Sequence, residues 1–512
     1  MGFTDLNKPK KTNGADNVNI SNPNSTFGEV LVVNAIPIAQ GDFVYNISTQ
    51  NFTTSAFAGS SVTQVSGACE LSSGTESSGS ATVQLRRRLE YRPGQGSLMR
   101  ATALFDTPSA GNAMFVGAGT GESGYFIGYF ATNFGVLHSI TGQREIRRLD
   151  VTTAAGTENV TVTLDGDSVV IPVTGGASEE QTAYQLSLGD YSQVGKGGWL
   201  ADTVSGSVYF ISARSNATST GSYSAVGASA GSLGSFTRVA VGEAQTNNFI
   251  ASGSFNIDKL DGTGPSGMTL DPQKGNVYQI GIQYLGYGNA HFAIEDPETG
   301  KFAPFHMIKN ANNVTVPVLK NPNLGVLATS ANIGGTTSKT LKTVSMAGFS
   351  EGNIQKLDPK YAKSFTFSGV NSATYVPIAI LKANRVFDDQ SCFGEFDILR
   401  LAASNESTAK TLTVGLFLNV ELTGEVNYQN VNGGESIVSY SDLTPTGGGA
   451  NTIVDLANQI PFYELLIGAL AADKEDLDPQ KFILQPGQNV MIAIKTSGSV
   501  AGQISINWFE QQ

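Results

Sequence analysis

Short stretches of alternating apolar residues, each ended by turn-forming residues, recur along most of this chain. At 83–91, for example, Val83, Leu85 and Leu89 follow a rough period of two before Arg-Pro-Gly-Gln-Gly breaks the pattern. A period of two places successive side chains on opposite faces of a β-strand, and glycine and proline supply the backbone angles of turns. The sequence therefore predicts a mainly β chain built from many short strands.

Composition supports this prediction. Charged residues make up 14% of the 512 residues, against roughly 25% in typical globular proteins. Glycine, with 59 residues, is abundant, together with serine, threonine and asparagine. Long exposed helices need glutamate, lysine, alanine and leucine, whereas hydroxyl-rich faces and tight turns suit strands. We therefore expect jelly-roll or β-sandwich domains, with room for more than one hydrophobic core.

Four segments differ in texture along the chain. Residues 1–27 are polar and without periodicity, which predicts a flexible N-terminal arm or anchor that orders against a partner. Residues 28–149 together with 244–350 predict one discontinuous, jelly-roll-like β-sandwich. Residues 150–243 predict a small α+β domain inserted into it, and 351–512 predict a C-terminal β-sandwich.

The inserted segment carries the sharpest local signals. Asp165-Gly166 lies between two β-branched runs, as a two-residue hairpin requires. Ser178 precedes an apolar stripe, with Gln181 three residues later, which is a capping-box pattern for a helix. A second helix is predicted over 451–470, and the composition shift at 149/150 marks the start of the insertion.

Several function classes are disfavoured by simple counts. The net charge of −12 argues against a nucleic-acid partner, because such binding needs Lys and Arg to neutralise phosphates. Cys69 and Cys392 alone cannot build a disulfide framework or a cysteine metal cluster, and we expect two free, buried thiols unless they meet. The longest apolar run, 460–472, is short and contains Glu464, so no membrane insertion is expected.

The stretch Leu-Asp-Gly-Thr-Gly-Pro-Ser-Gly at 260–267 resembles a binding loop. A phosphate loop would need a following helix, and an EF-hand would need alternating ligands and a distal glutamate; neither pattern is present. Asp258, Asp261 and Asp271 leave open a calcium site pooled from several loops. The favoured interpretation is a turn-rich connection without a metal or cofactor.

Other candidate chemistry is weak. His138, His291 and His306 lie in separate strand-like segments, and no pair has metal-ligand spacing. Glycan hydrolysis needs two converging carboxylates. Glu295 with Asp296, and Asp388 with Asp389, are candidates, yet adjacent residues on a strand point to opposite faces.

Three internal segments, 258–302, 90–105 and 124–137, carry a resemblance to a known family. Together they resemble structural proteins of tailed bacteriophages and some large DNA viruses, described as tail-fibre, head-fibre or other virion proteins. The segment 484–510 resembles the end of the same family. The resemblance implies a virion location and provides no catalytic or metal-binding residues to assign.

Arginines concentrate in two places in an otherwise acidic chain. Because guanidinium groups form bidentate contacts with carboxylates, these residues are predicted to lie at a subunit interface rather than on DNA. The candidates are Arg86, Arg87, Arg88, Arg92, Arg147 and Arg148.

Taken with the resemblance, these features predict a non-enzymatic virion structural protein, a homotrimer that serves as a fibre, attachment or decoration module. Its expected partners are further copies of itself, other virion proteins through the N-terminal arm, and a host-surface glycan or protein. Aromatic residues in 124–130 and 278–287 are candidates for stacking on sugars, although alternation places half of them in a core. The alternatives are a baseplate, neck or capsid-surface protein without a receptor, and a tailspike-like glycan hydrolase.

Overall fold

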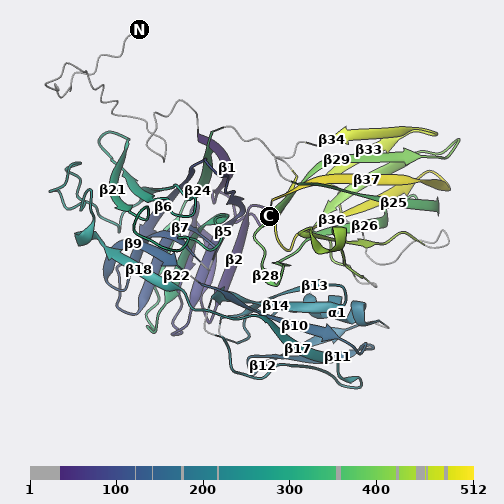
Figure 1. Cartoon of the computed structure of the whole chain (residues 1–512), viewed down its shortest axis with the longest axis horizontal. Helices are drawn as coiled ribbons and strands as arrows, with labels where there is room; N and C mark the ends of the chain where they lie inside the picture. The colour runs from purple at the N-terminus through teal and green to yellow at the C-terminus, as the bar shows by residue number, and fades with distance from the viewer. Residues whose placement is uncertain are drawn as a thin grey trace, which may run out of the picture. The chain divides into compact units, whose positions relative to one another are not determined.

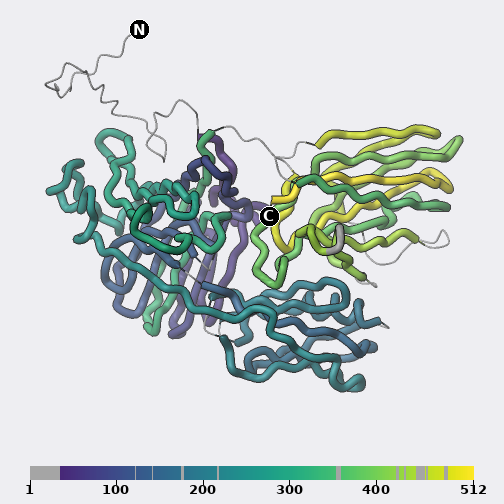
Figure 2. Tube along the Cα trace, viewed as in Figure 1, coloured from purple at the N-terminus to yellow at the C-terminus, as the bar shows by residue number. Residues whose placement is uncertain are grey.

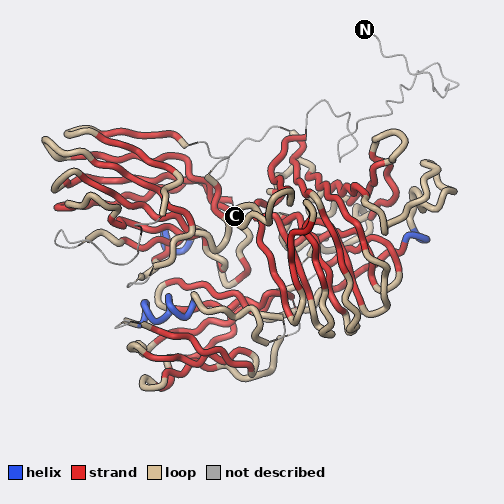
Figure 3. The backbone as a smooth tube through the Cα atoms, turned by 180° about the vertical axis from the view of Figure 1, so that it is seen from behind, coloured by secondary structure: helices blue, strands red, loops and turns tan. Residues whose placement is uncertain are grey.

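The computed structural model describes residues 35–511 except 121–122, 141, 175–177, 196, 216–217, 353–358, 423–425, 446–455, 457–458 and 478–481. The predicted arm, 1–27, lies outside the described residues. The described chain is mainly β, as predicted, and every pair of neighbouring strands is antiparallel (Figure 1). In Figure 3 strands, in red, make up most of the trace. No helix in the described part of the chain is long and apolar enough to cross a membrane.

The chain divides into two compact units, each made of two separate stretches of sequence. Unit 1 comprises residues 1–140 and 246–355, and unit 2 comprises 141–245 and 356–512. Figure 2 shows the trace leaving unit 1, forming the first part of unit 2, and returning. The two units are described separately below.

Unit 1 is a β-sandwich of two sheets. One sheet runs β21-β20-β19-β6-β23-β4-β3, with β24 also beside β6 and β1 beside β24; the other runs β18-β9-β8-β7-β22-β5-β2. The nine strands of the first sheet are β1 (Ala35–Asp42), β3 (Ser61–Val65), β4 (Ala68–Ser72), β6 (Ser97–Phe105), β19 (Asn276–Ile282), β20 (Ala290–Glu295), β21 (Phe302–Ile308), β23 (Thr340–Thr343) and β24 (Ser345–Glu351). The seven strands of the second are β2 (Phe52–Phe57), β5 (Ser80–Leu89), β7 (Asn112–Gly119), β8 (Gly124–Phe130), β9 (Asn133–Ile140), β18 (Thr246–Ala251) and β22 (Leu324–Asn332).

A single hydrophobic core joins these two sheets. Met99 of β6 and Ile280 of β19 meet Val116 of β7 and Ile127 of β8 in it, and all four side chains are fully buried. Alternate residues along each strand point inward, which is the pattern that the sequence predicts for a sandwich. The sandwich fold is thereby confirmed for unit 1.

Residues 141–245 of unit 2 form two four-stranded sheets and one helix around their own core. The sheets run β13-β14-β10-β17 and β12-β11-β15-β16. The elements are β10 (Arg144–Val151), β11 (Glu158–Leu164), β12 (Asp167–Val173), α1 (Glu179–Ser187), β13 (Trp199–Val204), β14 (Ser207–Ser215), β15 (Ser224–Gly227), β16 (Gly231–Ser232) and β17 (Gly234–Ala240).

Residues 356–512 of unit 2 form a second β-sandwich with a separate core. One sheet runs β25-β37-β29-β34, with β35 also on β29, and the other runs β31-β32-β26-β36-β30-β33. The strands are β25 (Lys360–Val370), β26 (Val376–Ala383), β27 (Val386–Phe387), β28 (Gln390–Ser391), β29 (Glu395–Asn405), β30 (Leu412–Leu418), β31 (Gln429–Asn430), β32 (Val438–Asp442), β33 (Tyr463–Ile467), β34 (Ala472–Asp476), β35 (Ile483–Leu484), β36 (Asn489–Thr496) and β37 (Val500–Gln511).

Buried contacts join the two parts of unit 2. The ring of Tyr184, on α1, packs in one apolar cluster with Phe417 and Met491 of the C-terminal sandwich, and its hydroxyl oxygen accepts from the N–H of Leu422 over 2.9 Å. The N–H of Ser205 donates to the carbonyl of Tyr428 over 2.7 Å. The segment predicted as an insertion into the first sandwich therefore makes a buried interface with the C-terminal one.

The predicted hairpin and the predicted helix cap are present in the structure, whereas the second predicted helix is not. Asp165 and Gly166, at φ 54° and 91°, form the predicted hairpin turn, and Ser178 caps α1 by accepting from the N–H of Gln181. The second predicted helix, 451–470, is wrong where the structure describes it, because β33 forms there and pairs with β30. The predicted border at 149/150 falls inside β10, which pairs with β14 and β17 along its length.

Candidate functional site

A seven-residue loop, 283–289, closes one end of the sandwich in unit 1, where β19 turns back into β20. The buried alternation of β19 ends at Ile282, and the chain reverses through Tyr-Leu-Gly-Tyr-Gly at 284–288. The N–H of Gly288 donates to the carbonyl of Tyr284 over 2.6 Å. A Cβ on Gly288 would lie 1.2 Å from the carbonyl oxygen of Gln283, so glycine is required for this turn.

A second segment holds this loop in place. The N–H of Val318 donates to the carbonyl of Gly286 over 3.0 Å, and the hydroxyl of Tyr284 donates to the carbonyl of Leu319 over 3.0 Å. The loop is thus bonded through its tip as well as its base. These hydrogen bonds favour the arrangement of the loop that the structure shows.

His138 ties the second segment to the core. Its Nε2 lies 3.0 Å from the carbonyl oxygen of Val318, so Nε2 carries the proton, because a carbonyl can only accept. The ring stacks on Tyr125 at 4.5 Å between centroids, and Asn310 donates both to the Tyr125 hydroxyl and to the carbonyl of Gly288. Burial lowers the pKa of His138, although its bond to Val318 opposes the shift. His138 is therefore a neutral structural residue.

Three apolar side chains project into solvent from these two segments. Leu285, Tyr287 and Val316 are 51%, 47% and 56% exposed. Leu285 also has a positive φ of 38°, a conformation that costs a non-glycine residue on the order of 1–3 kcal/mol and that occurs preferentially at functional sites. The surrounding hydrogen bonds keep it there.

Tyr91 completes the site from a distant part of the sequence. Its ring meets Tyr284 edge to face, with centroids 4.8 Å apart. Burial raises the pKa of both tyrosines, and the nearby hydroxyl groups of Tyr91 and Tyr287 raise the pKa of Tyr284 further. We call Tyr91, Tyr284, Leu285, Tyr287 and Val316 the tyrosine cluster.

The other aromatic run, at 124–130, behaves mainly as core. Tyr125 and Tyr129 point into the hydrophobic core of unit 1. Phe126 lies on the opposite face of the same sheet, where it is 9% exposed and packs beside Phe115. Gly117 leaves room for this ring, since a Cβ there would lie 2.5 Å from it. The sugar-stacking expectation thus has better support in the tyrosine cluster than here.

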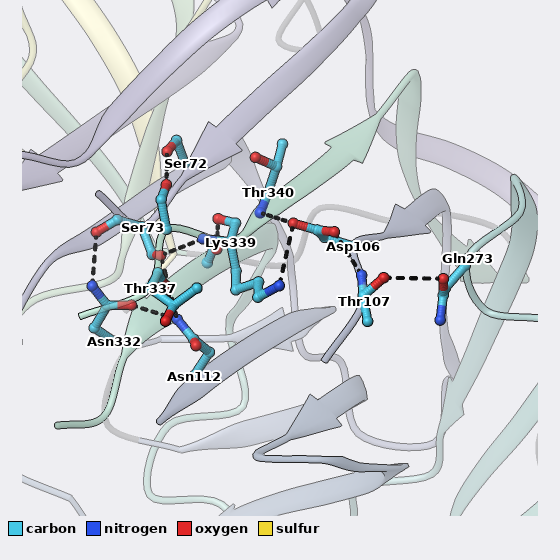
Figure 4. Close-up of polar contacts among 12 residues, drawn as sticks. Ser72, Ser73, Asp106, Thr107, Asn112, Gln273, Asn332, Thr337, Lys339 and Thr340 are labelled. Atoms are coloured by element: carbon cyan, nitrogen blue, oxygen red, sulfur yellow. Dashed lines mark hydrogen bonds and ion pairs between the residues drawn. The ribbon is translucent and has the colours of Figure 1, made fainter. Parts of the chain in front are cut away.

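The end of the sandwich away from this loop is a closed polar network (Figure 4). Asn112 donates to the side-chain oxygen of Asn332 over 2.5 Å, and the N–H of Lys339 donates to the hydroxyl of Ser73 over 2.9 Å. The ammonium of Lys339 lies 3.9 Å from the carboxylate of Asp106, just after β6. These groups bond mainly to one another, so they hold loops together rather than present a surface.

The loop at 260–267 is a turn organised by a buried carboxylate. Asp258 accepts the N–H groups of Leu260 and Ser266, each over 2.8 Å. Burial raises the pKa of Asp258, but these hydrogen bonds outweigh it and the net shift is downward. Gly264 lies so close that a Cβ there would be 2.0 Å from this carboxylate. The carboxylate therefore serves the turn itself.

The other chemical candidates also have structural positions. Asp296 accepts from the N–H of Glu298 and the hydroxyl of Thr299 in a turn, while Asp388 and Asp389 form the left-handed turn between β27 and β28. Cys69 is buried, as expected, which raises the pKa of its thiol to about 12, whereas Cys392 is only half-buried. Within the described residues, no three His, Cys, Asp or Glu side chains group as a metal site requires.

The six predicted interface arginines fall into both units and make internal contacts. In unit 1, Arg86 donates to the carbonyl of Thr49 over 2.6 Å, and Arg92 pairs with Glu90 at 2.9 Å. Arg87 and Arg88 lie half-buried on β5 beside Arg86. Their role between subunits stays a prediction.

The two arginines of unit 2 are neutralised within β10. Arg147 pairs with Glu145 at 2.6 Å and lies over the ring of Tyr223, and Arg148 pairs with Asp150 at 2.8 Å. Both pairs are local, so these arginines have carboxylate partners without a second subunit.

No protein-family model and no curated protein matches this chain. Solved structures similar to it include a legume lectin-like domain from Entamoeba histolytica, at 11% identity and a TM-score of 0.23, covering 60% of this chain and 95% of that one. Lectin I-B4 from Griffonia simplicifolia, in its metal-free form, has 9% identity and a TM-score of 0.23, covering 62% and 100%. Similarity at this level assigns no function, and the β-sandwich fold rests on the strands themselves.

Sequence reasoning found part of the tyrosine cluster. The aromatic run at 278–287 was a candidate for sugar stacking, with half of the aromatics expected in a core, and Tyr278 is one that lies there. Tyr91 and Val316 gave no signal of their own, because they reach the loop only through the fold.

Proposed function

We propose that this chain is a non-enzymatic structural protein of a virus or bacteriophage particle that attaches the particle to its host through the tyrosine cluster. The observation that carries this proposal is the exposure of Leu285, Tyr287 and Val316 on segments whose backbones are held by hydrogen bonds. The resemblance of 258–302 and 484–510 to virion proteins supports its place in a particle.

Rigid presentation makes such a surface effective for binding. Tyrosine offers a large amphipathic contact and loses little conformational entropy, and a pre-ordered loop avoids the further cost of ordering on contact. A homotrimer, joined to the particle through its N-terminal arm, would present several copies. Weak contacts would then add up to firm attachment through avidity.

Competition with intact particles tests this proposal. Purified protein is added to host cells before the particles, and the adsorption rate is measured. We expect the natural protein to slow adsorption, and Tyr287→Ala combined with Val316→Ser to lose this effect. The matched control is Val170→Ser, because Val170 is equally exposed, at 57%, on β12 of unit 2.

Three results would contradict the proposal. Equal competition by the double variant would remove the tyrosine cluster from attachment. Failure of an antibody against this chain to label purified particles would remove the chain from the particle. No competition by the natural protein, with labelled particles, would favour a baseplate, neck or capsid-surface role instead.

A further inference from the structure

Arg100 occupies an unusual position on unit 1. It lies on the outer face of the nine-stranded sheet, because its neighbours on β6, Met99 and Ala101, point into the core. Its Nε donates to Oε1 of Gln279, its cross-strand partner on β19, over 2.9 Å. The Nε end of the guanidinium is therefore held by a residue of the same sheet.

Two phenyl rings bracket the same guanidinium. Its Cζ lies 4.7 Å from the ring centroid of Phe302 and 5.4 Å from that of Phe349. Cation–π contacts of this kind fix the plane of the group. Neither terminal nitrogen of Arg100 bonds to a described residue, and neither is among the buried polar atoms without a partner, so both face solvent.

The surroundings of Arg100 leave its charge only partly compensated. Burial lowers its pKa, and Glu295 opposes this shift through its charge. No ion pair joins Arg100 to Glu295 among the described residues. A half-buried, oriented cation with two free nitrogens has the geometry with which arginine holds a carboxylate through two parallel hydrogen bonds.

We propose that Arg100 binds the carboxylate of an acidic glycan, that is, of a uronic acid, while a neighbouring sugar of the same chain contacts the tyrosine cluster. This inference rests on the proposed attachment function and adds the ligand class. The carboxylate of the ligand would bind on the outer face of the sheet, at Arg100, and a sugar ring would bind at the loop.

The register of the sheet relates the two sites. Ser97, at the start of β6, pairs with Ile282, the last residue before the loop. Arg100 stands three residues further along β6, a distance of roughly 10 Å at the rise of a strand. A short oligosaccharide covers such a distance, and the C–H face of a pyranose ring packs on an aromatic side chain. The tyrosines are uncharged, so they suit the ring of a sugar. They suit the acidic side chains of a carboxylate-rich peptide less well.

A matched pair of ligands tests this proposal by calorimetry. The probes are a homogalacturonan oligomer and its fully methyl-esterified form, which differ in charge but not in ring structure. We expect the natural protein to bind the free acid about tenfold more tightly than the ester. Arg100→Gln should abolish this preference, and Arg100→Lys should restore little of it, because lysine lacks the planar fork.

Two further variants separate the subsites. Tyr287→Ala should weaken the binding of acid and ester equally, leaving their ratio unchanged. Glu295→Gln should strengthen the binding of the acid alone, since it removes a like charge from beside the ligand.

Three results would overturn the inference: an undiminished acid preference in Arg100→Gln, tighter binding of a polyglutamate peptide than of galacturonan, or no binding of either oligosaccharide. Host adsorption by Arg100→Gln distinguishes this failure from that of the proposed function. If adsorption competition persists through the tyrosine cluster while galacturonan does not bind, attachment stands and the acidic-glycan assignment falls.

Discussion

Removal of the Lys382 ammonium is expected to destabilise unit 2 strongly. Lys382, on β26 of the C-terminal sandwich, pairs with Asp202, on β13, at 2.5 Å, and their side chains are 8% and 5% exposed. The ammonium also donates to the carbonyl of Thr203 and lies over the ring of Tyr428. The N–H of Arg385 donates to the second oxygen of Asp202 over 2.7 Å. This network crosses the interface between the two parts of unit 2.

The size of the effect follows from burial. Lys382→Met keeps the aliphatic volume but leaves the carboxylate of Asp202 buried without its cation, and loss of one member of a buried pair costs about 3–5 kcal/mol. Asp202→Asn should cost a similar amount, because Lys382 and Arg385 then face each other without an anion. The double variant removes both charges of the pair, so we expect its cost to be well below the sum of the single costs.

Tryptophan fluorescence reports on this unit alone. The chain has two tryptophans, Trp199 on β13 and Trp508 on β37, one in each part of unit 2. Urea unfolding of Trp199→Phe and Trp508→Phe backgrounds follows each part separately. We expect a common midpoint with Lys382 present, and a midpoint lower by about 1 M urea in Lys382→Met.

The exposed residue Lys474, on β34 of unit 2, provides the control as Lys474→Met, which should leave the midpoint unchanged. Equal midpoints for Lys382→Met and the natural protein would refute the reasoning, since the pair would then contribute nothing to the interface.

Three further outcomes are expected. Burial lowers the pKa of His306 to about 4, so the unfolded chain binds the proton more readily and stability falls as pH drops from 6.5 towards 4. His306→Phe should remove about 2–3 kcal/mol of this loss of stability between pH 7 and 4.5, measured by urea unfolding with circular dichroism at both pH values. Gly288→Ala should abolish adsorption competition without changing the far-ultraviolet spectrum, because its Cβ meets the carbonyl of Gln283. Deletion of 152–241 should lower the urea midpoint reported by Trp508, because it exposes the apolar cluster that Tyr184 covers. An unchanged midpoint would show that the segment contributes nothing to the stability of the C-terminal sandwich.

Strands and tight turns were predictable because their causes are local. The hairpin at Asp165-Gly166 needs positive φ at both positions, and both have it. The cap at Ser178 needs one side chain and one N–H three residues later, and that bond forms. Each of these signals is complete within a few residues, so no tertiary contact had to be known.

Longer apolar segments were less predictable because partners elsewhere decide their conformation. Residues 463–467 show no strict alternation and satisfy a helical pattern equally well. They become a strand because β30 offers a complete edge, with Leu465 and Ile467 pointing into the core. The segment 150–243 shows the same limit: its composition suggested that it stands apart, whereas Tyr184 and Asp202 bind it to residues far along the chain.

The scarcity of charge connects the fold to the proposed site. The carboxylates of Asp258 and Asp296 accept hydrogen bonds from N–H groups of their own turns. The carboxylate of Asp202 pairs with the buried ammonium of Lys382. All three carboxylates therefore have structural roles. Arg100 differs, because its terminal nitrogens have no partner among the described residues although its side chain is half-buried between two rings. The acidic glycan that we propose would supply the carboxylate that this guanidinium lacks among the described residues.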